Sequence, residues 1–341
     1  ISDCQSIGNG HVQHTAPFMG GGGGPAGWGG AIAVVPYEMY KIYGDKETFR
    51  RYLPKILRYF DYLDSRSSGG LVCREEEGGW CLGDWCPPEQ ITICEPFVNT
   101  ALYVKQMMMT KEASEAIGES ETAAMLEKRI EEKKQAILNA YYSPQTGSFI
   151  GDAQGANSFA VDIGLGGERA FNNTKKKYDA ADAFDTGIFG TDILIRVLFE
   201  RGCADTAFRL LTSTGKGSFY NMKKQGATTI WENWDGERSH SHPMFGAVTR
   251  YLFSFILGIT QEKNSAGYEK IVIAPQIPDG LNRASGHITT VRGEIAVSFV
   301  RTEREMDFYV TVPQKAWFTY GSDCEYELWE GENHIHIDFE E

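Results

Sequence analysis

Apolar residues recur every three or four positions from residue 31 onward, which is the spacing of one face of an α-helix. In the first such run these residues are Ile32, Val35, Met39 and Ile42. A second run, from Phe49 to Phe60, has the same spacing. Between the two runs, Gly44 is suited to end a helix and Asp45 to begin one. Because so short a link makes two helices run antiparallel, the pattern predicts an αα-hairpin.

The helical spacing returns several times before residue 258. The sequence predicts further helices at 96–109, 121–142, 187–201, 204–211 and 242–257, with a short helical pair around 154–164. This gives roughly eight or nine helices, mostly as hairpins, separated by loops rich in Gly, Trp and Asp. No short solenoid-type sequence repeat is visible, so the pattern favours a toroid of αα-hairpins.

After residue 258 the periodicity changes to that of β-strands. Ile295, Val297 and Phe299 alternate with polar or small residues, and the segment 306–312 alternates in the same way. The segments 271–275 and 326–329 are also rich in β-branched and aromatic residues. The sequence therefore predicts an α+β multidomain chain, with a helical domain at 1–262 and a small antiparallel β-sandwich at 263–341.

Composition narrows the range of partners. The 341 residues include 33 basic and 46 acidic side chains, which gives a formal net charge of −13. A surface this acidic repels phosphate backbones, so we expect no nucleic-acid partner. A neutral carbohydrate is compatible with the charge, and the aromatic content of 12% suits stacking on sugar rings.

Cysteine and histidine spacings give no clear metal site. The seven cysteines are an odd number, and Cys73, Cys81, Cys86 and Cys94 cluster without a CxxC spacing. This favours buried thiols over a disulfide or a zinc site. His334 and His336 alternate on a terminal strand, but two ligands do not define a metal site. We therefore predict no metal and no cofactor.

The first residues of the given sequence do not read as a targeting signal. The chain starts with Ile1 and has neither a signal peptide nor an apolar stretch of about eighteen residues. We expect part of a longer or processed polypeptide without a membrane span. Cytoplasmic, periplasmic and secreted locations all stay open, and so does the oligomeric state.

The segment 226–235 has the clearest chemical signature. It reads GATTIWENWD and places the carboxylate of Glu232 between Trp231 and Trp234, just before a predicted helix. Aromatic rings can stack on a sugar face while a carboxylate takes a proton from water. The alternative is a loop whose tryptophans pack in the core and whose glutamate is solvated.

This segment, followed by SHSHPMFG at 239–246, resembles the α-L-rhamnosidases of glycoside hydrolase family 78. Other stretches resemble family motifs and occur in the family's order, namely Gly27 to Ala31, Gly83-Asp84-Trp85, Asp185 to Thr191 and Tyr268 to Pro275. The resemblance covers nearly the whole chain. It implies an (α/α)6 toroid of the six-hairpin glycosidase type, with its N-terminal helices missing, followed by the β-sandwich.

The resemblance also implies roles for single residues. Glu232 corresponds to the general base that activates the attacking water. Trp28 and Trp85 correspond to tryptophans of the sugar pocket, and His242 to a histidine of the sugar subsite. We expect Trp231 and Trp234 to extend the apolar wall, and Asp84 and His242 to bind sugar hydroxyls. The implied reaction releases terminal α-L-rhamnose with inversion from a rhamnosylated glycan or glycoside, without a cofactor.

One essential group is missing from the motifs. Inversion requires two carboxyl groups about 6.5–9.5 Å apart. The family's general acid lies in a motif similar to DERLGWTGD, which has no counterpart in this chain. We therefore expect the acid upstream of Ile1 and this chain alone to be inactive. Asp84, Glu89 and Asp235 are the carboxyls within the chain that could substitute for it.

Three departures from the family pattern leave the function open. Gly30 stands where the family has Asp, Ser241 stands where Asn usually precedes the histidine, and the stretch from Glu232 to His242 is short. One alternative is a non-catalytic carbohydrate-binding relative. Another is a toroid glycosidase that acts on a different deoxysugar or on a uronide. The upstream sequence would test the first alternative, and a panel of substrates the second.

Overall fold

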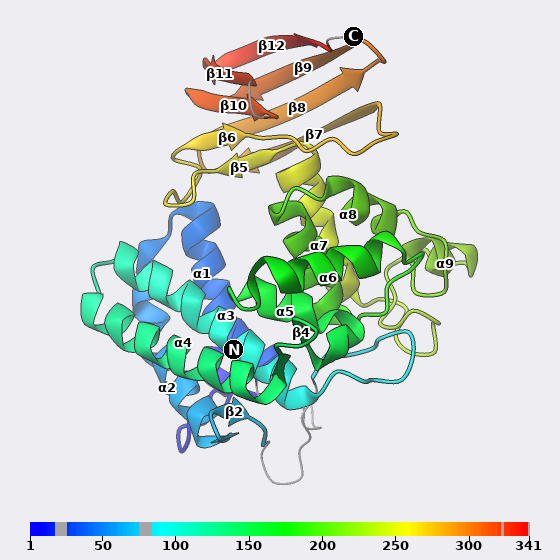
Figure 1. Ribbon diagram of the computed structural model, residues 1–341. Coiled ribbons are helices and arrows are strands. Elements are labelled where there is room, and N and C mark those ends of the chain that lie inside the picture. The colour runs from blue at the N-terminus through cyan, green and yellow to red at the C-terminus, as the bar shows by residue number, and fades with distance from the viewer. Residues whose placement is uncertain (18–25, 75–82, 322–323, 340–341) are drawn as a thin grey trace.

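A computed structural model describes residues 1–17, 26–74, 83–321 and 324–339 of the chain. Helices make up the first part of the chain and strands the last part, as Figure 1 shows. This is the α+β arrangement that the sequence predicts. Cys81, for which the sequence predicts a buried thiol, lies outside the described residues.

In the helical domain, several consecutive helices pack against each other in pairs. The α-helices are α1 (Ala31–Tyr43), α2 (Lys46–Ser65), α3 (Glu95–Ala116), α4 (Ser120–Tyr141), α5 (Ala156–Asp162), α6 (Gly167–Asp179), α7 (Ile188–Glu200), α8 (Ala204–Leu211) and α9 (Phe219–Lys224). The shorter helical turns are η1 (Ser2–Cys4), η2 (Trp28–Gly30), η3 (Ile150–Gly155), η4 (Pro243–Thr249) and the π-helical η5 (Leu252–Ile256). Two small ribbons pair β1 (Ser67–Ser68) with β2 (Leu71–Val72) and β3 (Tyr142–Ser143) with β4 (Ser148–Phe149).

The first hairpin forms where the sequence predicts it, but α1 buries a different face. Gly44 ends α1 with a φ of 72°, and the Asp45 side chain accepts a hydrogen bond from the Thr48 N–H to begin α2. Val35 and Ile42, which the periodicity places on the buried face, are exposed. The buried residues are Ile32, Ala33, Pro36 and Tyr40. α1 contacts both α2 and α3, so its buried face is set by two neighbours rather than one.

Two other helical predictions need correction. The sequence does not predict the helices α6 and α9. For α6 the reason is that its buried stripe is narrow and consists of Ala170, Phe171, Thr174 and Tyr178. The segment 242–257 is not one α-helix, because it divides into η4 and η5. The change of helical type in this segment leaves no regular period of 3.6 residues.

Two four-stranded sheets follow the helices, with strand orders β11-β10-β6-β5 and β12-β9-β8-β7. Their strands are β5 (Ile259–Gln261), β6 (Ile271–Ile273), β7 (Arg283–Thr290), β8 (Gly293–Arg301), β9 (Glu305–Val312), β10 (Ala316–Tyr320), β11 (Cys324–Leu328) and β12 (Gly331–Asp338). Within the described residues the pairings are antiparallel, as predicted, except that β6 and β10 are parallel. The rings of Phe308 and Phe318, one from each sheet, meet at a centroid distance of 4.9 Å in the sandwich core.

The β-sandwich covers one end of the helical domain (Figure 1). Gln276 donates a side-chain hydrogen bond to the Phe199 carbonyl, near the C-terminus of α7, and Gln261 donates one to the Lys41 carbonyl of α1. The N-terminus of α7 therefore faces the opposite end of the domain. The predicted division at residues 262 and 263 stays a prediction, and β5, which precedes it, already pairs with β6.

The sequence predicts buried thiols at the cysteines and no helix that spans a membrane. Free, partly buried thiols are found at Cys4, Cys73, Cys86, Cys94, Cys203 and Cys324. Among the described residues, none of the helices combines the length and the apolar character needed to cross a bilayer.

Candidate active site

Glu232 lies in a loop, residues 229–242, that folds back on itself. The Glu232 N–H donates to the Ser239 carbonyl at 2.8 Å, and the His242 N–H donates to the Ile230 carbonyl at 2.9 Å. These bonds tie the two arms of the loop together. The half-buried Glu232 carboxylate accepts hydrogen bonds from Trp85 Nε1 at 3.1 Å and from the Ser239 N–H at 3.3 Å. Two sequence motifs 147 residues apart therefore meet at one carboxylate.

The carboxylate of Asp84 packs so closely against the stretch from Thr186 to Thr191 that two of its positions have room only for glycine. This carboxylate accepts hydrogen bonds from the N–H groups of Gly187 at 2.7 Å, Phe189 at 3.0 Å and Gly190 at 3.1 Å. A Cβ on Gly190 would lie 2.6 Å from Asp84 Oδ2, and one on Gly187 would lie 2.8 Å from Asp84 Cγ. Larger residues at these two positions would push the carboxylate away from the start of α7.

The same contacts fix the position of Trp85. The Trp85 carbonyl accepts a hydrogen bond from the Ile188 N–H at 2.7 Å, so Asp84 and Trp85 together cap α7. Asp84 is fully buried, and burial raises the pKa of its carboxyl to about 7, while the backbone N–H donors act in the opposite direction. The sequence predicts that Asp84 binds a sugar hydroxyl. In this structure the protein itself occupies both carboxylate oxygens.

The two tryptophans beside Glu232 are buried. Trp234 is 2% exposed, its Nε1 donates to the Thr186 carbonyl at 3.2 Å, and its ring stacks on Phe184 at a centroid distance of 5.5 Å. Trp231 is 6% exposed and stacks on the His240 ring at 4.5 Å. The sequence predicts both rings in the wall of the sugar pocket. In the structure other aromatic rings of the protein cover both tryptophans. Their contacts hold the loop that carries Glu232 in place.

Trp28 lies next to the same helix end. Its half-buried ring meets the Phe189 ring edge-on at a centroid distance of 4.7 Å. At Gly30, where the family resemblance implies Asp, a Cβ would lie 2.5 Å from Cδ of the buried Gln106 of α3. Gln106 Nε2 donates to the Ala26 carbonyl at 2.7 Å. An amide from α3 thus fills the place of an acidic side chain.

His242 is half-buried at the end of the loop that carries Glu232. Its Nδ1 is shielded from solvent and has no hydrogen-bond partner among the described residues. The backbone bond to Ile230 holds the residue on the same loop as the carboxylate.

Sequence reasoning missed Arg238. Its guanidinium lies 4.8 Å from the centre of the Trp85 ring, on the side chain that donates to Glu232. A cavity of about 300 Å³ beside this pair is lined by Trp85, Glu89, Asp235 and Arg238, among others. Two of the three carboxyls considered as substitute acids therefore line a cavity beside Trp85, whose ring nitrogen donates to the candidate base. No motif contains Arg238, so its sequence position gave no signal.

A second cavity lies between α1, α3 and α7 and has a volume of about 1000 Å³. Its walls carry paired charges, since Lys105 and Arg196 both bind Asp162, and Lys41 binds Glu112. Within the described parts of the chain, the motif residues are not among those that line it. The smaller cavity does have motif residues in its wall, Trp85 and Trp234 among them, but Glu232 is not one of the residues that line it.

Comparison with known families agrees with this architecture. The model of the bacterial alpha-L-rhamnosidase 6 hairpin glycosidase domain matches residues 1–256, and that of the bacterial alpha-L-rhamnosidase C-terminal domain matches residues 258–318. The helices and the strands therefore represent a six-hairpin glycosidase domain followed by its C-terminal β domain. The chain belongs to the bacterial α-L-rhamnosidase family.

Individual relatives are distant in sequence and close in fold. An α-L-rhamnosidase of Alteromonas sp. (strain LOR) is 26% identical over 314 residues, which cover 84% of this chain and 33% of the relative. One from Streptomyces avermitilis is 28% identical over 313 residues, which cover 87% of this chain and 28% of the relative. The chain thus spans about a third of the length of these relatives.

Solved structures show the same fold over nearly the whole chain. The S. avermitilis α-L-rhamnosidase complexed with L-rhamnose has a TM-score of 0.85 at 23% identity, covering 98% of this chain and 35% of that chain. The native α-L-rhamnosidase from Aspergillus terreus has a TM-score of 0.88 at 20% identity, covering 98% of this chain and 42% of that chain. At these identities the likeness shows the fold alone.

Proposed function

We propose that the protein to which this chain belongs hydrolyses terminal α-L-rhamnosyl bonds. The observation that carries the proposal is the hydrogen bond from Trp85 Nε1 to Glu232, which joins two motifs at one half-buried carboxylate. The relatives named α-L-rhamnosidases support the substrate class. The C6 methyl group of L-rhamnose suits a wall that includes the rings of Trp28 and Trp85.

In this proposal Glu232 is the general base of an inverting reaction. Two hydrogen bonds fix the direction of its carboxylate, so it can take a proton from a water molecule that attacks the anomeric carbon. A second carboxyl about 6.5–9.5 Å away protonates the leaving oxygen. We place this acid in the motif that the family resemblance implies upstream, with Glu89 and Asp235 as the alternatives within the chain. Asp84 is a poor alternative, because α7 occupies its oxygens.

The contacts divide the remaining site residues into two groups. Trp28, Trp85 and His242 are only half-buried, so we propose that they contact the sugar. Asp84, Trp231 and Trp234 are buried, and we propose that they position the two loops that carry Trp85 and Glu232. The substrate is a rhamnosylated glycan or glycoside, and the reaction uses no cofactor.

One observation favours a second candidate function, sugar binding without catalysis. The neutral Gln106 amide fills the place beside Gly30 where the family resemblance implies a carboxylate. A site with fewer acidic groups can still bind a sugar, but it has less capacity for proton transfer.

Hydrolysis of p-nitrophenyl α-L-rhamnoside by the whole natural protein to which this chain belongs tests the proposal. We expect turnover of this substrate and little turnover of the matched α-L-fucoside and β-D-glucuronide. Turnover of the fucoside or the glucuronide alone would move the activity to another deoxysugar or to a uronide. Binding of L-rhamnose in calorimetry without any hydrolysis would support the non-catalytic alternative instead.

Trp85→Phe is expected to lower kcat about 10–100-fold with a small change in KM. Phe keeps an aromatic ring but removes the Nε1 donor, and a hydrogen bond to a charged group contributes about 1.5–3 kcal/mol. The Glu232 carboxylate then loses one of the two hydrogen bonds that direct it. Initial rates on the rhamnoside give both constants. Trp329→Phe in the β domain, where the side chain is 63% exposed, is the control and should leave both constants unchanged. An increase in KM alone would show that Trp85 only binds substrate.

A further inference from the structure

Metal-binding side chains gather on the outer face of the β-sandwich, on the paired strands β9 and β12. In the register of this pair, His336 lies opposite Asp307 and Asp338 lies opposite Glu305. Alternate residues of a strand point to the same side of its sheet, so these four side chains share one face. The residues between them point the other way, and Met306, between Glu305 and Asp307, is buried in the sandwich core.

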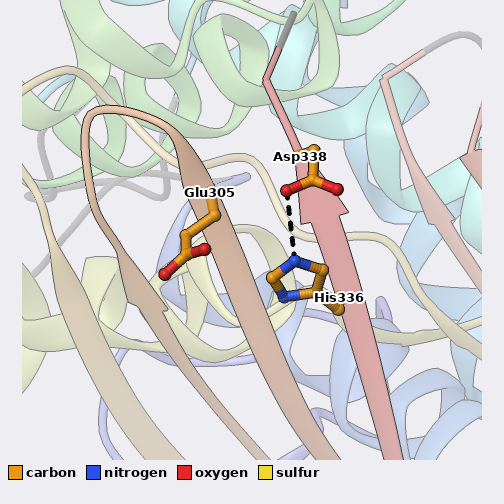
Figure 2. Close-up of side chains that lie close together, drawn as sticks. All are labelled: Glu305, His336 and Asp338. Carbon is orange, nitrogen blue, oxygen red and sulfur yellow. Dashed lines mark hydrogen bonds and ion pairs between the residues drawn. The ribbon is translucent and has the colours of Figure 1, made fainter.

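We propose that Glu305, His336 and Asp338 bind a divalent transition-metal ion, with Zn²⁺ as the best fit. One possible ligand atom from each of the three residues lies within 4.8 Å of those of the other two. Figure 2 shows the His336 ring facing Asp338, with Glu305 beside them on the neighbouring strand. One ligand atom of each side chain thus lies near those of the other two, on the same face of the β9–β12 pair.

The spacing within the cluster fits a tetrahedral ion. His336 Nε2 and Asp338 Oδ1 are 3.2 Å apart. Zinc ligands bound at about 2.0–2.2 Å lie roughly 3.3–3.5 Å from one another in a tetrahedron. Two ligands therefore already have nearly the required separation. Glu305 has three rotatable side-chain bonds and can close the remaining distance without any change in the backbone.

Asp307 holds the His336 ring in the orientation that metal binding requires. Its Oδ1 lies 2.9 Å from His336 Nδ1, so Nε2 on the other side of the ring faces Asp338. A carboxylate on the far nitrogen of a metal-bound histidine is the arrangement that orients such ligands in zinc sites. Asp307 Oδ1 also lies 2.7 Å from His334 Nε2. His334 therefore holds Asp307 in place and does not bind the ion.

The donor set selects the kind of ion. One imidazole nitrogen and two carboxylates suit Zn²⁺, whereas Ca²⁺ and Mg²⁺ prefer sites made only of oxygen ligands. β12 is the edge strand of its sheet, and His336 and Asp338 are exposed, so an ion can enter from solvent. A bound zinc ion would link the edge strand β12 to its neighbour β9. Three protein ligands leave a fourth position for water.

Calorimetric titration of the chelator-treated full chain with ZnCl₂ tests the proposal. We expect one ion per chain and a Zn²⁺-dependent rise in Tm. His336→Ala should remove binding or weaken it more than about 100-fold, and Asp307→Asn should weaken it about 10–100-fold. His336→Gln, which keeps the side-chain size and its hydrogen-bonding capacity, should fail in the same way while remaining folded by circular dichroism.

The matched control is His287→Ala, because His287 is exposed on the same outer face, opposite Ala296 of β8. This variant should keep the wild-type affinity for zinc. Equal affinity in His336→Ala and the wild type would overturn the proposal, and so would the absence of zinc binding up to about 1 mM. Binding of CaCl₂ that is tighter than that of ZnCl₂ would also overturn it, because it would indicate an oxygen-only site.

Discussion

Glu232→Gln is expected to lower the kcat of the natural polypeptide on p-nitrophenyl α-L-rhamnoside about 10²–10⁴-fold, with little change in KM. The substitution keeps the volume of the side chain, and its amide oxygen can still accept one of the two hydrogen bonds, the one from Trp85 Nε1. The amide has no basic oxygen that can take a proton from the attacking water. The loss should therefore appear in the chemical step, and steady-state rates measure it.

Addition of azide separates the role of base from a loss of structure. Azide attacks without losing a proton, so it should restore part of the turnover of Glu232→Gln and give a rhamnosyl azide of inverted configuration. Glu89→Gln and Asp235→Asn are the companion variants, since both carboxyls line the cavity beside Trp85. Unchanged rates in both on an alkyl rhamnoside, whose poor leaving group needs protonation, would count against either residue as the general acid. Full activity of Glu232→Gln would show that another group is the base.

The fold could be predicted where the sequence carries a strong local period. The α1–α2 hairpin is marked by Gly44 and Asp45, whose backbone and side-chain preferences act within a few residues. The buried face of α1 could not be predicted, because Ile32 and Val35 are equally apolar and only contacts with α2 and α3 distinguish them. The strand β7 (Arg283–Thr290) gives no signal because it alternates between exposed and half-buried positions.

The candidate site could be predicted from motifs, but the roles of its residues could not. Trp85 and Trp234 both stand beside an acidic residue in a loop. Contacts with the distant residues Thr186 and Phe184 bury Trp234, whereas Trp85 stays half-buried beside Glu232. The zinc site escaped prediction for a similar reason. His336 acquires Asp307 and Glu305 only through the register of β9 and β12, which the sequence does not reveal.

Asp84→Ala is expected to lower the free energy of unfolding by about 3–5 kcal/mol. The substitution leaves three backbone N–H groups at the start of α7 without their acceptor in a fully buried place, and each unsatisfied group costs about 1–3 kcal/mol. Relaxation of the loop is expected to recover part of that sum. Urea unfolding followed by circular dichroism measures the change.

The control for this variant is Asp45→Ala. Asp45 also begins an α-helix, but its surroundings are more open, and it accepts hydrogen bonds from the N–H and the hydroxyl of Thr48. Its loss should cost about 0.5–2 kcal/mol, which is usual for a cap. Equal losses in the two variants would show that burial adds nothing at Asp84. A larger loss at Asp84, together with lower activity, would agree with its role in positioning Trp85.

Asp84→Asn adds a test of the electrostatics, because an amide does not titrate. Burial raises the pKa of Asp84 in the folded protein to about 7, and the unfolded value is about 3.9. Between these values the folded state keeps a proton that the unfolded chain releases, so the stability contributed by Asp84 falls as the pH rises from about 4 to about 7. The stability difference between the wild type and Asp84→Asn should therefore be larger at pH 5 than at pH 8. A difference that grows with pH would mean that the three N–H donors outweigh burial.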